Sequence, residues 1–140
     1  MRKTYLLAAL MLTAFQIRAA TCPKFERSYE ACYSRSMIES FQVNRVEVID
    51  TKPNYEFLIK TRYELMHFKF ATNGVPEEVR QPVPYVQTAH CLGDRIHLVI
   101  QNENEFGKES YEFLPKSEQL TIKTYLNSVL INEVICRTTD

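Results

Sequence analysis

The sequence predicts an all-β protein, an antiparallel meander that closes into a small barrel of about seven or eight strands after a short N-terminal helix. Three observations predict it. From residue 41 onwards, short segments rich in β-branched and aromatic residues alternate between apolar and polar positions. Mostly short turn clusters of two to six residues separate these segments. No helical pattern of 10–15 residues lies between them, which excludes a parallel sheet.

The first twenty residues have the composition of a secretory signal peptide. A basic start at Arg2 and Lys3 precedes an apolar run over 5–15 and then small residues. The run is too short to span a bilayer, which needs about 20 residues. We therefore expect a signal peptide at 1–20, with its cleavage site left open, and a single disulfide-linked β-domain at 21–140, periplasmic or secreted and without a transmembrane segment.

The balance of charge excludes a nucleic-acid partner. The chain has 17 basic and 17 acidic residues. Removing 1–20 takes away three basic residues and no acid, so 14 basic and 17 acidic residues remain, a net charge of about −3. No block of Lys and Arg survives, whereas nucleic-acid binding needs a concentrated basic face.

Four cysteines, Cys22, Cys32, Cys91 and Cys136, lie outside the signal peptide. An even number in an exported chain indicates two disulfides. If residues 22–32 are helical, ten residues at 1.5 Å each place Cys22 and Cys32 about 15 Å apart, beyond disulfide reach. We therefore favour two long-range bridges and leave the pairing open. Lipidation of Cys22 is an alternative that Thr21 disfavours, and zinc is not expected because no Cys-x-x-Cys occurs.

Residues 23–40 favour a short helix that leads into the first strand. Ser36 and Glu39 have the spacing of a capping box. A first strand is the alternative, and this choice decides between seven and eight strands. Four apolar or aromatic residues recur at helical spacing: Phe25, Tyr29, Cys32 and Tyr33.

The next segments have the pattern of strands. One is predicted over 41–49, and 55–63 alternates cleanly before the apolar parity changes to that of 66–70. No Gly, Pro or Asn marks a turn at the change, so it is either a bulge in one bent strand or a tight hairpin. Residues 75–84, with three prolines, are predicted as a loop, the only connection long enough for the alternative fold, a β-sandwich.

The most readable hairpin joins 83–92 to 95–102 through Gly93-Asp94, a two-residue turn of the type that needs Gly first. Short connections then lead onwards along the meander. Three further strands are predicted over 108–114, 118–126 and 129–138.

The same turn sets the register of the hairpin. Counting outwards pairs Cys91 with Ile96 on the interior face and His90 with His97 on the other. Two directly opposed imidazoles have Cβ atoms about 4.5–5.5 Å apart, close enough to share a metal. A complete site would need another ligand, such as His67. Two solvated histidines are the simpler interpretation, so we expect neither a metal nor a cofactor.

The chain has no catalytic motif. Neither a Gly-x-Ser-x-Gly elbow nor a His-Glu-x-x-His sequence occurs. Bridged cysteines leave no thiol nucleophile, and Glu77-Glu78 lies in the proline-bounded loop, where solvation is the simpler interpretation. We predict a non-enzymatic protein.

Apolar and aromatic residues on the strands 55–63 and 66–70 carry the prediction of ligand binding. A small barrel fills with such side chains, but an unfilled part would form a pocket for a small hydrophobic or lipid-like ligand. The alternative is a protein-interaction or inhibitor module that uses the loops 75–84 and 102–105 of a filled barrel. In either case a monomer is expected. The predicted ligand-binding residues are Tyr55, Phe57, Ile59, Tyr63, Phe68 and Phe70.

The cysteine pattern also carries a family resemblance. The residues concerned are Cys22-Pro23, Tyr29, Cys32 and the run Cys91-Leu92-Gly93-Asp94-Arg95-Ile96. With a signal peptide and a meander, they resemble small exported bacterial β-proteins of lipocalin-like, or calycin-like, outline. The Gly-x-Trp signature of lipocalins is absent, because the chain has no Trp. The resemblance implies a lipocalin-like barrel architecture.

Overall fold

The structure, a computed structural model, describes residues 21–35, 42–80, 83–102 and 107–139. The predicted signal peptide, the capping box of Ser36 and Glu39, and most of the 102–105 strip lie outside these residues.

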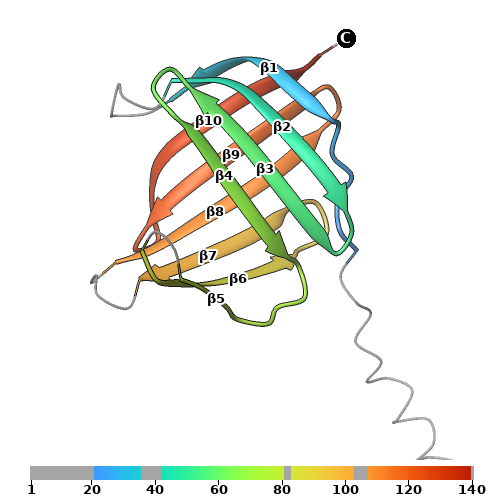
Figure 1. Cartoon of the computed structure of the whole chain (residues 1–140). Helices are drawn as coiled ribbons and strands as arrows, with labels where there is room; N and C mark the ends of the chain where they lie inside the picture. Colours follow the sequence, from blue (N-terminus) through green and yellow to red (C-terminus); the bar gives the residue numbers. More distant parts are fainter. Residues whose placement is uncertain (1–20, 36–41, 81–82, 103–106, 140) are drawn as a thin grey trace, which may run out of the picture.

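Ten antiparallel strands form one sheet that curls into a nearly closed barrel (Figure 1). This confirms the all-β meander, but the predicted count of seven or eight strands is too low. The order in the sheet is β4-β3-β2-β1-β10-β9-β8-β7-β6-β5, so the first and last strands pair and the sheet edges are β4 and β5. The strands are β1 (Ser28–Ser34), β2 (Val43–Thr51), β3 (Asn54–Thr61), β4 (Leu65–Ala71), β5 (Glu77–Val79), β6 (Tyr85–Cys91), β7 (Ile96–Asn102), β8 (Lys108–Lys116), β9 (Gln119–Leu126) and β10 (Val129–Thr138).

The predicted N-terminal helix over 23–40 is wrong, because β1 occupies its centre and no helix is present in the described part of the chain. Ala31 has a positive φ of 49° and lies in a β-bulge, where β1 has one residue more than β10. The bulge breaks the two-residue alternation, so Tyr29 and Cys32, three residues apart, both pack against the core. A bulged strand thus imitates the apolar spacing of a helix.

The parity change after residue 61 is a tight hairpin between β3 and β4. The Thr61 hydroxyl accepts hydrogen bonds from the backbone N–H groups of Tyr63 and Glu64, at 3.3 and 3.0 Å. A threonine hydroxyl therefore does here what Gly or Asn does in more recognisable turns. Tyr63, expected to face the interior, lies in this turn and is 77% exposed.

The β6–β7 hairpin forms as predicted. Gly93 has a φ of 77°, and the register opposes Cys91 to Ile96 and His90 to His97. Cys91 and Ile96 are buried, so the interior face is also the predicted one.

The predicted loop 75–84 contains a short edge strand, β5, which pairs with β6. Next to β5, the end of β4 and the loop that follows it contact β6. The Gln87 side-chain amide donates to the Lys69 carbonyl at 2.8 Å, and Gly74 N–H donates to the Ala89 carbonyl at 2.9 Å. The remaining part of the boundary between β4 and β6, towards the start of β4, forms a seam in the barrel wall.

Two disulfides connect distant parts of the chain, as expected. Cys22 bonds to Cys91 and Cys32 to Cys136, across 69 and 104 residues. The helical argument against a local bridge was wrong, because β1 is a strand. The two bridges are typical of a protein that folds in an oxidising compartment, extracellular or periplasmic.

The segment 22–27 closes the end of the barrel opposite the β3–β4 turn (Figure 1). Phe25 is buried against the ring of Phe57, with centroids 5.1 Å apart. Val48 N–H donates to the Arg27 carbonyl at 2.9 Å, which attaches the segment to β2. Together with the Cys22 disulfide, these contacts fix the segment across this end.

Candidate ligand-binding cavity

Aromatic side chains fill the half of the barrel that the N-terminal segment closes. Phe57 and Phe113 stack with their ring centroids 4.1 Å apart, and Phe70 lies 5.9 Å from Phe57. Tyr55 and Phe57 are both 0% exposed. Burial raises the pKa of Tyr55 to about 12, with a further contribution from the Asp50 carboxylate. Among the described residues, this half is therefore a core of closely packed rings.

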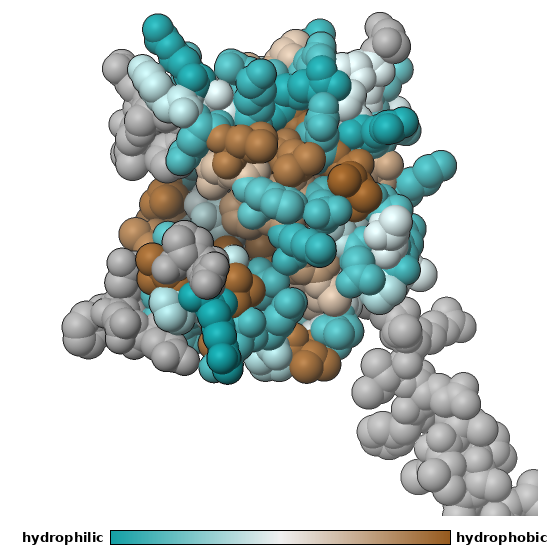
Figure 2. All heavy atoms as spheres, in the orientation of Figure 1, coloured by the Kyte–Doolittle hydropathy of each residue, from teal (hydrophilic) through white to brown (hydrophobic). Residues whose placement is uncertain are grey.

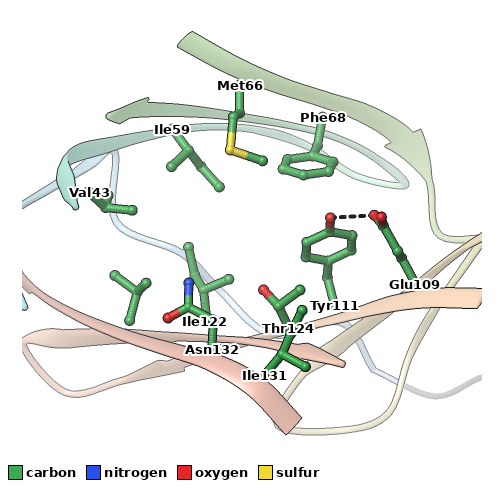
Figure 3. A pocket seen from close by; sticks show the side chains of 11 residues that line it. Val43, Ile59, Met66, Phe68, Glu109, Tyr111, Ile122, Thr124, Ile131 and Asn132 are labelled. Atoms are coloured by element: carbon green, nitrogen blue, oxygen red, sulfur yellow. Dashed lines mark hydrogen bonds between the residues drawn. The ribbon is translucent and has the colours of Figure 1, made fainter. Parts of the chain in front are cut away.

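The opposite half of the barrel encloses a cavity of about 110 Å³ (Figure 3). Its wall comes from β2, β3, β4, β8, β9 and β10. At this end the inward positions carry mostly aliphatic side chains, which leave space that rings fill in the other half. Three lining residues are polar: Glu109, Thr124 and Asn132. The apolar and aromatic lining residues are Val43, Ile59, Met66, Phe68, Tyr111, Ile122, Ile131 and Val134.

Two hydrogen bonds hold polar side chains in the cavity wall. The Tyr111 hydroxyl donates to Glu109 Oε2 at 2.8 Å, on the side of the cavity nearest Phe68 (Figure 3). Burial and the neighbouring Glu109 carboxylate raise the pKa of Tyr111, so its hydroxyl stays protonated and donates. On the opposite wall, Asn132 Oδ1 accepts from the Ser34 hydroxyl at 2.8 Å.

The cavity adjoins a surface groove of about 280 Å³ that follows the seam. The two share Met66, Phe68, Glu109 and Tyr111. The far side of the groove comes from β6, β7 and the residue Val83 that precedes β6. The cavity and the groove thus lie on either side of the same four side chains.

Hydrophobic side chains are exposed around this end of the barrel. They lie on the β3–β4 turn, before β6 and around the β9–β10 turn, and some of the brown spheres in Figure 2 lie on this left-hand side, with others across the middle and right of the view. The exposed residues are Tyr63, Leu65, Val83, Leu126, Val129 and Leu130. The apolar character of the cavity thus continues onto the surface.

A second hollow, of about 540 Å³, lies between β4 and β5. Polar and charged residues such as Lys69, Glu77 and Gln87 make up much of its wall. It is open to solvent along the loop that contains Val75 and Pro76. Its mixed character is less suited to an apolar ligand than the enclosed cavity is.

The six predicted ligand-binding residues lie in three places. Ile59 and Phe68 line the cavity, and Tyr63 is exposed in a turn. The other three, Tyr55, Phe57 and Phe70, are buried in the core, where Phe70 also borders the hollow between β4 and β5.

Sequence reasoning missed the contribution of β8 to the cavity. Glu109, Tyr111 and Phe113 alternate along one face of this strand, and the first two reach the cavity. The alternation itself was a usable signal, because the strand was predicted from residue 108. The aliphatic lining residues of β9 and β10 gave no signal that distinguishes a pocket from a core.

The histidines do not converge. His90 and His97 are opposed with ring centroids 6.3 Å apart, while His67 bonds to Glu56 at 3.0 Å on another hairpin. In the described ranges, no group of three metal-ligating side chains lies close enough together to hold an ion.

Residues 21–35, 42–80, 83–102 and 107–139 contain no helix that could span a membrane.

No protein family model and no curated protein matches the sequence. Solved structures do match. The chain is similar to the REP1-NXSQ fatty acid transporter with a TM-score of 0.59 and 10% identity, over 81% of this chain and 92% of that one. It is similar to fatty-acid-binding protein 1 of Echinococcus granulosus with a TM-score of 0.56 and 10% identity, over 80% and 94%.

A mutant of the fluorescent protein UnaG also matches, with a TM-score of 0.50 and 11% identity over 69% of this chain and 72% of that one. None of these three proteins is an enzyme by name. At such low identity the likeness concerns the fold alone. The chain therefore shares the barrel fold of these proteins.

Proposed function

We propose that this protein binds a small hydrophobic ligand, an alkyl or fatty-acyl chain being the best fit, in the cavity at the open end of its barrel. The observation that carries the proposal is the cavity itself, because the other half of the same barrel is filled by aromatic rings. Largely apolar, partly enclosed space with a few polar groups is typical of small-molecule sites. The names of the structurally similar fatty-acid-binding proteins support the same ligand class.

The dimensions of the site limit the part of the ligand that is enclosed. An engineered protein cavity of about 150 Å³ holds one benzene molecule. The cavity here, at about 110 Å³, therefore suits a chain end of a few carbons. The rest of the chain would lie in the adjoining groove of about 280 Å³, against Met66 and Phe68.

The setting of this function is part of the proposal. Residues 1–20 act as a signal peptide, and the domain 21–140 works outside the cytoplasm as a monomer without enzymatic activity. The two disulfides support an oxidising compartment.

Two measurements test ligand binding. Native mass spectrometry of the exported, disulfide-bonded protein, purified without detergent, should reveal a bound hydrophobic molecule that is released on denaturation. Isothermal titration with octan-1-ol, an uncharged probe, should show saturable binding of one molecule per chain.

A pair of variants locates the site. Ile122→Phe puts a ring into the cavity and should abolish octanol binding, whereas Ile49→Phe makes the same change on the exposed outer face and should leave it intact. Octanol binding that survives Ile122→Phe would exclude this cavity as the site. A bare polypeptide mass together with no octanol binding would contradict the proposal and favour a protein-interaction module.

A further inference from the structure

The electrostatics of the cavity specify the polar end of the ligand. Glu109 is the only acidic residue among the described residues that line the cavity, and no Lys, Arg or His lines it. Glu109 lines the groove as well as the cavity, so its carboxylate can meet the polar end of a chain whose tail occupies the cavity. We infer, on the basis of the proposed function, that the preferred ligand is a hydrophobic chain with a cationic, hydrogen-bond-donating end such as a primary amine, held by Glu109.

The Glu109 carboxylate is positioned for this role. The Tyr111 hydroxyl donates to Oε2 at 2.8 Å, while Oε1 has no hydrogen-bond partner among the residues that the structure describes. Tyr111 is 8% exposed and anchored in the wall, so it fixes a carboxylate that is itself exposed at the mouth. One oxygen is thus held in place, and the other remains available to an ammonium group.

A ligand carboxylate has no comparable partner at this site. It would approach Glu109, a like charge, and the described lining offers no cation to offset the repulsion. Asn132 and Thr124 are neutral and cannot compensate a buried negative charge. His67, in the groove, is bonded to Glu56 at 3.0 Å. A fatty acid would therefore bind only with its carboxylate in water, outside the mouth.

A set of probes with one chain length tests this preference. Octylamine, octan-1-ol and octanoate have the same tail and differ in the charge of the end group at pH 7. Titrated separately into the disulfide-bonded protein at low salt, octylamine should bind about tenfold more tightly than octanoate, with octanol between them.

Matched variants assign the preference to Glu109. Glu109→Gln should bring the affinities for octylamine and octanoate to within about twofold of each other. Glu133→Gln removes an equal charge from the outer face of β10, next to Asn132, and should keep the preference. Tyr111→Phe retains the ring but releases the carboxylate, so it should lower the affinity for octylamine more than the affinity for octanol.

The outcomes separate this inference from the proposed function. If octanol binds and octanoate binds as tightly as octylamine or more tightly, the cationic preference is wrong and ligand binding stands. The same conclusion follows if Glu109→Gln leaves the preference intact. If none of the three probes binds, the proposed function fails as well.

Discussion

The two halves of this barrel use the same alternation of side chains and reach opposite results. In the closed half, the inward positions of β3, β4 and β8 carry Tyr55, Phe57, Phe70 and Phe113, whose buried rings stack on one another. In the open half, β4 and β8 still contribute the rings of Phe68 and Tyr111, but Ile59 and the aliphatic side chains of β2, β9 and β10 are smaller, and a cavity remains. Side-chain volume at equivalent positions therefore decides whether a β-barrel encloses a core or a pocket.

The closed half also has a cover that the open half lacks among the described residues. Phe25, from the N-terminal segment, packs edge-on against Tyr55 and Phe57. The Cys22–Cys91 disulfide holds that segment against the β6–β7 hairpin. The segment 22–27 thus buries apolar surface and excludes water from the closed end of the barrel. The seam beside β4 lies at the open end.

The largest change in unfolding free energy is expected when one aromatic ring is removed from each half of the barrel in turn. Phe57→Ala should lower the free energy of unfolding by about 3–5 kcal/mol, because the ring is fully buried among other rings. Phe68→Ala should lower it by only about 1–2 kcal/mol, because Phe68 is partly exposed beside a cavity, but should weaken octanol binding. Urea denaturation and octanol titration of both variants provide the measurements. If Phe57→Ala and Phe68→Ala lost the same unfolding free energy and the same octanol affinity, the closed and open halves of the barrel would not differ in packing.

Removal of the Cys22–Cys91 bridge should cause the next largest loss of unfolding free energy. The double variant Cys22→Ala, Cys91→Ala should lose about 2–4 kcal/mol of unfolding free energy, since the bridge closes a loop of 69 residues. Because the bridge lies in the closed half, octanol affinity of the folded fraction should not change. The unfolding midpoint in urea, measured beside the native protein, gives the loss. A clear fall in affinity under folding conditions would show that the two halves are coupled.

Larger side chains should produce a smaller difference in stability between the closed and open halves of the barrel. Ile96→Phe, at a site that is 0% exposed in the filled part of the barrel, should destabilise the protein by about 1–3 kcal/mol through overpacking. Ile122→Phe makes the same change beside the cavity and should destabilise it by less than about 1 kcal/mol, since the added ring has space. Thermal unfolding of the two variants compares them directly, and a larger loss in Ile122→Phe would argue against a preformed cavity.

The smallest effect is expected on the outer face, away from both halves of the interior. Partial burial lowers the pKa of His97 below 6.5, although the Glu112 carboxylate opposes the shift. The unfolded chain therefore binds this proton more readily than the folded one. The contribution of His97 to stability is fully present above pH 6.5 and is lost as the pH falls through the lowered pKa of the folded state.

The variant His97→Gln isolates this contribution. Its unfolding free energy should decline less than that of the native protein when the pH is lowered from 7 to 5. Urea denaturation at several pH values gives the two slopes. Parallel slopes would show that His97 has the same pKa in the folded and unfolded states.

A feature of the fold could be predicted from the sequence where residues that are neighbours in the chain determine it. The β6–β7 hairpin could be predicted to the residue, because Gly93-Asp94 sets the turn and the turn sets the register of Cys91 and Ile96. At the β3–β4 hairpin, the sequence left a bulge and a tight turn as alternatives, because the hydroxyl of Thr61 forms the turn without Gly or Asn. The bulge at Ala31 misled the prediction, since it gives a strand the spacing of a helix.

The candidate site was less predictable than the fold. Alternation correctly placed Ile59 and Phe68 towards the interior, but it also placed Tyr55 and Phe57 there, and only the first two line the cavity. The difference depends on which rings and which aliphatic side chains share a layer across non-adjacent strands. Glu109 reached the site for the same reason, through the packing of β8 opposite β4.

The sequence by itself determined the class of the protein: strands from period-two alternation, turns from Gly and Asp, and two disulfides from four cysteines. Only the tertiary structure decided that β1 pairs with β10, that Cys22 bonds to Cys91, and that the space lies beside Glu109 instead of Phe57. The physical reason is the range of the interactions. Turns and alternation arise between neighbours in the chain, whereas closure, disulfide pairing and cavity volume depend on side chains that meet only when distant strands pack together.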